Sequence, residues 1–219
     1  MTVAAADLTL DEMRATLAPP IAANAAFDGW GETALAAAAG EAGIDPGHAR
    51  LAFPGGGPDM IDAWFAEADK AMAARLPPDA VAAMKVRARI RAAVLARLEA
   101  TRGEREALRR ALAVLAQPAN LTLGARLAWR AADAMWRLAG DTATDLNHYT
   151  KRAILSGVYG ATVLVFLDDA SDGLADTRAF LDRRIDGIMR FEQAKARLRL
   201  DPDRMFDPVR FLGRLRYPG

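Results

Sequence analysis

One short stretch of the sequence, TATDLNHYTKR at residues 142–152, brings Asp145, His148 and Tyr149 together with two basic residues. Asp145 and His148 have the spacing of a carboxylate and an imidazole that bind iron in a di-iron site. Such a site needs a second pair and further carboxylates from other helices, and the one other histidine, His48, lies near the N-terminus. We therefore expect no metal ion and no cofactor. Acid–base catalysis by Asp145 and His148 stays open as an alternative.

The same stretch has the features of a helix start. Thr142 and Asp145 have the spacing of a capping box, in which each residue satisfies a free backbone N–H of the first turn. Asp141 adds negative charge where the helix dipole favours it. Helix-start chemistry thus explains the acidic residues and leaves His148 and Tyr149 as side chains for contact with a partner.

The composition predicts an all-α protein. The chain has 219 residues, 52% of them hydrophobic, and it is rich in Ala, Leu and Arg, which favour helix over strand. It contains no Cys, which excludes disulfides and thiolate metal sites. No serine lies in a nucleophile elbow, and the glycine-rich FPGGGPD lacks the Lys and Ser/Thr of a phosphate loop. We expect no enzymatic activity.

The N-terminal region predicts a helix-turn-helix. It comprises a helix over 10–30 interrupted at Pro19-Pro20, a helix that ends near Gly43, and a helix over 45–53 with Asp45 as N-cap. Residues 1–65 hold nine acidic and two basic residues, a net charge of −7, whereas the rest of the chain carries +8. Because DNA affinity depends on Lys and Arg contacts to phosphate, this acidic module should repel a duplex. We expect no nucleic-acid partner.

The segment 149–167 predicts a central helix that is apolar on nearly every face. Small residues on it let a neighbouring helix or a lipid chain approach the backbone. Either this helix is ordinary core, or it encloses a long apolar cavity, and periodicity alone does not separate the two. The other wall of such a cavity would come from Leu127, Trp129, Met135, Trp136 and Leu138. The candidate lipid-binding residues are Leu127, Leu138, Ile154, Gly157, Val158, Ala161, Val163 and Phe166.

The tail, residues 201–219, predicts a short amphipathic helix. Its apolar face is opposite a face with Asp207, Arg210 and Arg214, a pattern that suits the interface of an anionic membrane. Docking on the chain's own domain or on a second copy in a homodimer is the alternative. The candidate membrane-contact residues are Met205, Phe206, Val209, Phe211, Leu212 and Leu215.

Residues 140–152, GDTATDLNHYTKR, follow the pattern GD-x-[ST]-T-D-[FL]-N-x-YT-[KR]-R, and FDGW and FPGG occur nearer the N-terminus. In these features the chain resembles the lipid-binding accessory proteins of coenzyme Q (ubiquinone) biosynthesis, over roughly residues 10 to 195. The resemblance implies a TetR-type fold that binds an isoprenoid lipid, and its N-terminal part is similar to the TetR helix-turn-helix. The chain departs from some relatives, which carry Trp at the position of His148. The smaller imidazole ring offers less apolar area to the surface patch that, in those relatives, contacts the hydroxylase.

The resemblance further implies that the protein binds an isoprenoid quinone or a phospholipid and presents a ubiquinone intermediate to a membrane-associated di-iron hydroxylase. The implied partner-contact residues are Met135, Trp136, Asp145, His148 and Tyr149. A TetR-type transcriptional regulator that senses an apolar ligand is the alternative function.

We predict three parts: a degenerate helix-turn-helix module (1–57), a helical lipid-binding domain (58–200) and a membrane-contact helix (201–219). The N-terminus has no basic region followed by an apolar core, so we expect no signal peptide. The longest apolar run, residues 153–167, is too short to span a bilayer. We therefore expect a cytoplasmic protein that associates peripherally with the inner membrane.

Overall fold

The computed structural model describes residues 8–142 and 146–198 of the chain, and every regular element in these two ranges is a helix. This confirms the predicted all-α class. The chain divides into two compact units, residues 1–181 and residues 182–219. The predicted membrane-contact helix at 201–219 lies outside the described residues.

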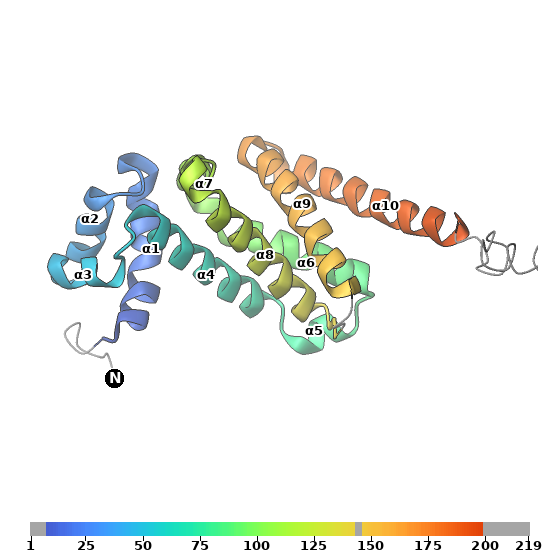
Figure 1. The fold of residues 1–219 in the computed structure, drawn as a ribbon, viewed down its shortest axis with the longest axis horizontal. Coiled ribbons are helices and arrows are strands. Elements are labelled where there is room, and N and C mark those ends of the chain that lie inside the picture. Colours follow the sequence, from blue (N-terminus) through green and yellow to red (C-terminus); the bar gives the residue numbers. More distant parts are fainter. Residues whose placement is uncertain (1–7, 143–145, 199–219) are drawn as a thin grey trace, which may run out of the picture. The chain divides into compact units, whose positions relative to one another are not determined.

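The described part of the first unit begins with three helices: α1 (Leu10–Asp28), α2 (Glu32–Ala42) and α3 (Pro46–Ala52) (Figure 1). α2 ends at Gly43, whose left-handed backbone (φ 66°) favours glycine. The Asp45 side chain accepts a hydrogen bond from the His48 backbone N–H at 3.1 Å and so caps α3. The predicted ends of α2 and α3 are confirmed.

The predicted interruption of the first helix at Pro19-Pro20 is wrong, because α1 continues through both prolines. Each proline removes a backbone N–H donor. The Asn24 side chain donates to the Pro20 carbonyl at 2.9 Å. The surrounding turns are held by residues that are completely buried, including Leu17 and Ile21. Burial of this face outweighs the two lost backbone hydrogen bonds.

The FDGW and FPGG elements of the sequence meet in space. A Cβ atom on Gly57, which follows FPGG, would lie 2.4 Å from the Trp30 carbonyl oxygen of FDGW, so only glycine fits there. The buried Trp30 indole donates to the Ala107 carbonyl at 3.0 Å and packs against the Trp64 ring. The two short motifs thereby join the three-helix module to the helices that follow it.

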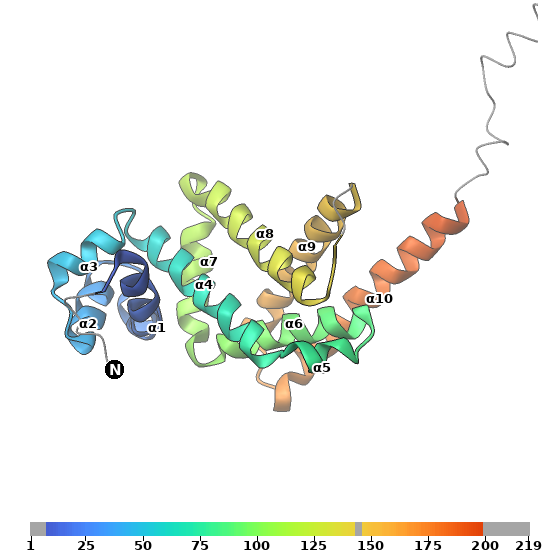
Figure 2. The same cartoon turned by 90° about the horizontal axis from the view of Figure 1, so that it is seen from below.

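Within the described residues, seven further helices follow, with short 3₁₀ turns at Arg102–Glu104, Pro118–Asn120 and Asp172–Leu174. In the first unit, α4, α6, α7, α8 and α9 pack on one another, and α1 packs on α4 and α7 (Figures 1 and 2). The helices are α4 (Gly57–Arg75), α5 (Pro78–Ala82), α6 (Val86–Ala100), α7 (Arg105–Leu115), α8 (Leu121–Leu138), α9 (Leu146–Asp168) and α10 (Ala175–Leu198).

Residues 78–100 form two helices, α5 and α6, rather than one. Lys85 is extended between them (φ −68°, ψ 150°). The Arg89 guanidinium donates to the carbonyls of Met84 at 2.8 Å and Ala82 at 3.1 Å. It also donates to the Ala139 carbonyl at 2.9 Å, at the end of α8. Arg89 thus satisfies carbonyls that the break exposes and fixes the break beside α8.

α9 is longer than the apolar run that the sequence suggested. From His148 to Asp168 it is long and apolar enough to cross a membrane by length and composition alone, which corrects the expectation from the 15-residue run. In the structure α9 packs on α6, α7 and α8. It buries Leu155, Val163 and Phe166 together with the charged Arg152. One face of α9 therefore packs on the core, but Tyr149 and Leu164 on the same helix are more than half exposed, so the predicted central helix, apolar and covered on nearly every face, is wrong.

Candidate functional site

An apolar pocket of about 410 Å³ opens between α4, α6, α7, α8 and α9. This volume falls within the range of roughly 300–1,000 Å³ typical of small-molecule sites. Its mouth is lined by two exposed side chains, Leu121 (57% exposed) and Leu164 (61% exposed). Leu108 and Leu127 line its buried part. The other lining residues are Phe65, Arg97, Leu112, Leu115, Ala116, Gly124, Ala125, Ala128, Ala131, Tyr159, Gly160 and Val163.

Two polar side chains, Arg97 of α6 and Tyr159 of α9, mark what we call the buried end of the pocket. Arg97 is only 1% exposed. Its Nε donates to Asp69 Oδ1 at 2.6 Å, and its Nη1 donates to the Tyr159 hydroxyl. Its Nη2 is 3.4 Å from the Phe65 carbonyl oxygen. The guanidinium also lies 5.1 Å from the ring centres of Phe65 and Tyr159, so cation–π attraction adds to these bonds.

These neighbours fix the protonation of both polar groups. Burial disfavours the charge on Arg97, but Tyr159 and Asp69 outweigh it and raise the pKa of the guanidinium above its usual value. Burial raises the pKa of Tyr159, and the opposing effect of Arg97 is smaller. At neutral pH the buried end therefore presents a cation paired with a carboxylate and a protonated phenol.

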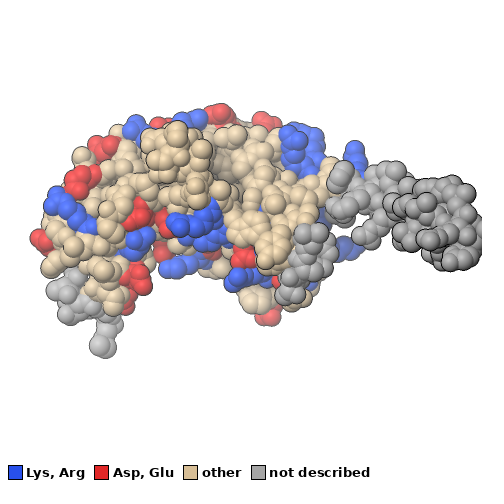
Figure 3. All heavy atoms as spheres, viewed as in Figure 1, with Lys and Arg blue, Asp and Glu red and all other residues tan. Residues whose placement is uncertain are grey.

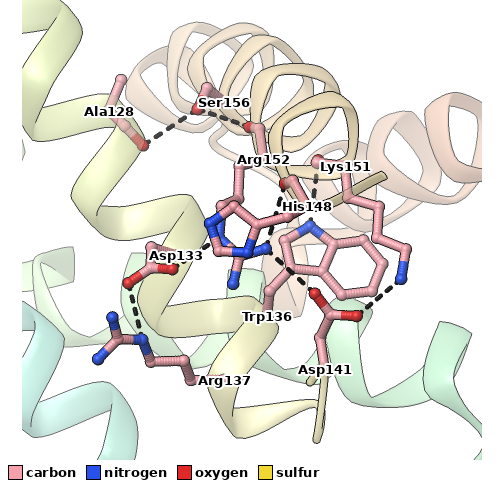
Figure 4. A network of polar contacts seen from close by, with 9 residues as sticks. All are labelled: Ala128, Asp133, Trp136, Arg137, Asp141, His148, Lys151, Arg152 and Ser156. Atoms are coloured by element: carbon pink, nitrogen blue, oxygen red, sulfur yellow. Dashed lines mark hydrogen bonds and ion pairs between the residues drawn. The ribbon is translucent and has the colours of Figure 1, made fainter. Parts of the chain in front are cut away.

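A second polar cluster joins the end of α8 to the start of α9, and we call it the α8–α9 junction (Figure 4). At its centre Arg152, 2% exposed, donates to Asp133 Oδ1 at 2.6 Å and to Asp141 Oδ2 at 3.1 Å. It also donates to the His148 carbonyl at 3.2 Å. Two carboxylates and one carbonyl thus surround a single buried guanidinium. Arg137 completes the cluster with an ion pair to Asp133 at 2.8 Å.

Asp141 and Lys151 extend the junction to an aromatic side chain. Lys151 Nζ donates to Asp141 at 2.7 Å and lies 5.2 Å from the centre of the Trp136 ring (Figure 4). The Trp136 indole donates to the Lys151 carbonyl at 3.1 Å. Desolvation acts to raise the pKa of Asp141, but bonds from Lys151 and Arg152 outweigh it and lower that pKa below its usual value. Asp141 therefore pairs with side chains of α9, which the helix-start interpretation had not foreseen.

Aromatic side chains gather beside this junction, and we call Trp129, Trp136, His148 and Tyr149 the aromatic surface. The Tyr149 ring lies 6.1 Å from the Trp129 ring and 5.1 Å from the His148 ring. Tyr149 is 60% exposed. His148 and Trp136 are half-buried, and Trp136 is held by the junction through Lys151. The salt-bridge cluster thus supports aromatic rings that reach the solvent.

The structure separates the predicted lipid-binding residues into two groups. Leu127 and Val163 line the pocket. Val158 and Phe166 are buried without lining it, and Gly157 is exposed on α9. The remaining predicted residues, Leu138, Ile154 and Ala161, are half-buried and also do not line it.

The predicted partner-contact set changes as well. Met135 is completely buried, so its side chain belongs to the core, and its predicted place on a contact surface is corrected. Trp136, His148 and Tyr149 reach the surface. Asp145, and with it the predicted capping box from Thr142, lies outside the described residues. The same holds for all six predicted membrane-contact residues, from Met205 to Leu215.

The walls that α4, α6 and α7 contribute to the pocket, including Phe65, Arg97 and Leu112, were not among the predicted residues. A signal was present for Arg97. It stands seven residues after Ile90 and three after Val94, on the buried stripe of α6, where a charged residue is unexpected. No local pattern indicated that α7 would face α9.

Neither metal ligation nor a basic DNA-reading face is evident in the part of the chain that the structure describes. No group of three or more His, Cys, Asp or Glu residues there could hold a metal ion. In α3, Arg50 forms an ion pair with Glu32 of α2 at 2.5 Å. Acidic and basic side chains alternate over the visible face of the three-helix module rather than forming a continuous basic surface (Figure 3).

Residues 121–192 match the COQ9 family model. The chain is 45% identical to the mitochondrial ubiquinone biosynthesis protein COQ9 of Rattus norvegicus over 80 residues, which are 36% of this chain and 26% of that protein. The human COQ9 protein is 41% identical over 80 residues, 36% of this chain and 25% of its own length. The chain thus spans about a quarter of the length of these relatives.

Two further comparisons reach beyond this segment. The mitochondrial coq9 protein of Schizosaccharomyces pombe is 29% identical over 133 residues, 61% of this chain and 53% of that protein. Among solved structures, a TetR transcriptional regulator from Nitrosomonas europaea superimposes with a TM-score of 0.64 at 21% identity. The superposition covers 80% of this chain and 97% of the regulator, and it shows a shared TetR-like fold.

Proposed function

We propose that this chain, whose residues 121–192 match the COQ9 family model, is an accessory protein of ubiquinone biosynthesis that binds an isoprenoid lipid in the pocket between α4, α6, α7, α8 and α9. One observation carries the proposal: the α8 and α9 walls of the pocket fall within the matched residues, from Leu121 to Leu164. The pocket is apolar along most of its length, as an isoprenoid chain requires. In this proposal the protein binds and orients the lipid and carries out no chemical step.

The energetics favour a lipid over an empty pocket. Each buried CH₂ group contributes about 0.8 kcal/mol relative to water, so even a short part of an isoprenoid chain would gain several kcal/mol. The open mouth at Leu121 and Leu164 lets the remainder of a long chain leave the pocket. A binding site of this kind holds one end of the lipid and leaves the other to a bilayer.

Two glycines of α9 supply a matched test of lipid binding. Gly160 lines the pocket and Gly157 does not, and a Cβ atom on either would meet nothing within 4 Å. The full chain and the Gly160→Leu and Gly157→Leu variants would be purified from cells that make ubiquinone, and their lipids identified by mass spectrometry. We expect quinone or its precursors with the unmodified chain and Gly157→Leu, and a large loss with Gly160→Leu. Recovery of bilayer phospholipid alone from all three proteins would overturn the proposal.

We further propose that the aromatic surface contacts the hydroxylase that receives the lipid. It combines the exposed Tyr149 ring with Trp136, whose position Lys151 fixes, as protein interfaces use aromatic anchors. Tyr149→Ala should weaken binding of the purified hydroxylase without changing lipid content. Phe27→Ala, at an exposed aromatic side chain of α1, is the control. Equal hydroxylase binding by Tyr149→Ala and the unmodified chain would exclude this surface.

Peripheral attachment to the inner membrane completes the proposal and rests on the amphipathic pattern of residues 201–219. Flotation with vesicles that contain anionic lipid should depend on these residues. Transcriptional regulation remains the second candidate, because the TetR-like fold is shared with a regulator. The Arg50–Glu32 ion pair and the acidic module argue against it. Salt-dependent binding of duplex DNA would favour the regulator instead.

A further inference from the structure

The buried end of the pocket carries polar groups that an isoprenoid tail does not need. A site for hydrocarbon alone would gain most from apolar walls throughout, because burying charged or polar groups has a desolvation cost. Instead, Arg97 of α6 is 1% exposed and lines the pocket together with the Tyr159 hydroxyl-bearing ring of α9. These groups are positioned by Asp69 and by each other.

We propose that this end of the pocket recognises the oxygen-bearing ring of a prenylated quinone, with the Tyr159 hydroxyl donating a hydrogen bond to a ring oxygen and Arg97 holding that hydroxyl in place. The lipid enters with its ring first, and its isoprenoid tail runs toward Leu121 and Leu164 at the mouth. This inference rests on the proposed lipid-binding function and adds the orientation and the chemical class of the ligand.

The hydrogen-bond inventory supports a ligand acceptor at this point. The Tyr159 oxygen accepts from Arg97 Nη1, and among the described residues no acceptor receives the hydroxyl hydrogen. Arg97 itself has N–H donors beyond its bonds to Asp69, Tyr159 and the Phe65 carbonyl. Buried donors of this kind are normally paired, so an oxygen atom of a bound molecule completes the arrangement.

The local charge favours a neutral head group over an anionic one. Asp69 pairs with Arg97 at 2.6 Å and with Arg130 at 3.4 Å, and Arg130 also pairs with Asp62. Two cations are thus balanced by two carboxylates, and the buried end has no net charge to offer a phosphate or a carboxylate. An anion placed there would also face the Asp69 carboxylate in a medium of low dielectric constant. A quinone carbonyl accepts hydrogen bonds without bringing a charge, and the Phe65 ring beside Arg97 suits a flat ligand.

This orientation shelters the ring from solvent while the lipid is bound. The ring must leave the buried end before it can reach a partner protein. The lipid-filled pocket is therefore the form in which the protein carries the lipid, and not the form in which it hands the lipid over. A lipid bound with its head outward would leave the Tyr159 hydroxyl hydrogen facing hydrocarbon. The two orientations therefore differ in one measurable feature, the hydrogen bond from the Tyr159 hydroxyl to a ring oxygen, which forms only when the ring lies at the buried end.

The experiment compares two probes, geranyl-benzoquinone and the oxygen-free geranylbenzene, by calorimetric titration of the full chain and of Tyr159→Phe. The unmodified chain should bind the quinone about fivefold more tightly than the hydrocarbon, the effect of one buried hydrogen bond. Tyr159→Phe should remove that difference and leave the affinity for geranylbenzene unchanged. Leu112→Ala, at an apolar lining position, should weaken both probes by the same factor.

The outcomes distinguish the two proposals. Equal affinity for both probes in the unmodified chain, with no effect of Tyr159→Phe, overturns the ring-recognition inference and leaves the lipid pocket intact. Binding of neither probe overturns both. If Tyr159→Phe fails to fold, the infrared band of a ¹³C-labelled quinone carbonyl bound to the unmodified chain decides. A shift below its frequency in hexane supports the hydrogen bond, and the hexane frequency overturns it.

Discussion

Arg152 at the α8–α9 junction and Arg97 at the buried end of the pocket are almost equally buried, but their surroundings differ. Arg152 is enclosed by Asp133, Asp141 and the His148 carbonyl, and each of these partners is part of the protein. Arg97 has one carboxylate, Asp69, and its other strong partner is the Tyr159 hydroxyl at the edge of a cavity. The first guanidinium pairs with two carboxylates, whereas the second pairs with one and lines a pocket that a ligand can fill.

The number of carboxylate partners and the nearness of a cavity distinguish a buried arginine that stabilises the fold from one that can take part in ligand binding. Burying an ion is unfavourable unless pairing and hydrogen bonds offset the desolvation, and Arg152 meets that requirement without a ligand. Its cluster ties the end of α8 to α9 and holds Trp136 of the aromatic surface through Lys151. Arg97 has one carboxylate partner, and an uncharged hydroxyl takes the place of the second. Changes at the two sites should therefore differ in size and in their dependence on lipid.

The largest effect is expected for Arg152→Met. The substitution removes the buried guanidinium that Asp133 and Asp141 share and leaves them only the more exposed cations Arg137 and Lys151. Breaking such a buried pair costs about 3–5 kcal/mol. Typical domains have roughly 5–15 kcal/mol of stability, so the variant should unfold at much lower urea concentration. Circular dichroism during urea titration measures the loss.

The matched control is Arg137→Ala, which removes the other guanidinium paired with Asp133. Arg137 is exposed and forms its ion pair within α8, so its removal should change stability by only about 0–1 kcal/mol. If Arg152→Met and Arg137→Ala cost the same, the junction is not a structural centre and the comparison fails.

Arg97→Met should cost less in the lipid-free protein, about 2 kcal/mol. The remaining Asp69 carboxylate still has Arg130 Nε at 3.4 Å, and its side chain is 14% exposed to solvent. Lipid should stabilise the unmodified chain more than the variant, because Arg97 no longer positions Tyr159. Thermal unfolding with and without a short-chain quinone measures both quantities. A loss as large as that of Arg152→Met, with no dependence on quinone, would make Arg97 a second structural centre.

The sequence was sufficient for the elements whose signals are local. Asp45 before Pro46 predicted the start of α3, and Gly43 predicted the end of α2, because capping depends on residues within one turn. Pro19 and Pro20 misled the prediction of α1, since the burial that keeps this helix intact comes from other helices.

The pocket was only partly accessible to sequence reasoning. Leu127 and Val163 were expected and line it, but Gly157 and Gly160 are three residues apart on one helix and periodicity does not say which one faces the cavity. Arg97 is one of several arginines on α6, and its partner Asp69 is 28 residues away. Contacts between distant segments decided these positions.

The contribution of the α8–α9 junction to stability should depend on pH. The pKa of Asp141 is lowered in the folded protein by Lys151 and Arg152, against the effect of burial, so this carboxylate stabilises the fold above its usual pKa of about 3.9. The contribution is lost as the pH falls through the lower folded value. Asp141→Asn should cost about 1.5 kcal/mol at pH 7. The cost should disappear in strong acid.

Urea midpoints of the unmodified chain and of Asp141→Asn at pH 7, 5, 4 and 3 test this dependence. The two curves should lie apart at pH 7 and 5 and converge below about pH 4. A difference that stays constant down to pH 3 would mean that the Asp141 charge does not stabilise the junction.

The smallest effect concerns the open space beside Tyr159, and it tests whether the cavity exists in the lipid-free protein. Gly160 lines the pocket and Gly157 lies one turn away outside it, and a Cβ atom at either position would contact nothing within 4 Å. Gly157→Ala and Gly160→Ala should each stabilise α9 by about 0.5–1 kcal/mol, because alanine loses less backbone freedom on folding. Equal gains in urea midpoint would show that both positions border open space. If Gly160→Ala destabilises the protein while Gly157→Ala stabilises it, side chains already fill the region beside Gly160, and Arg97 becomes a closed structural ion pair like Arg152.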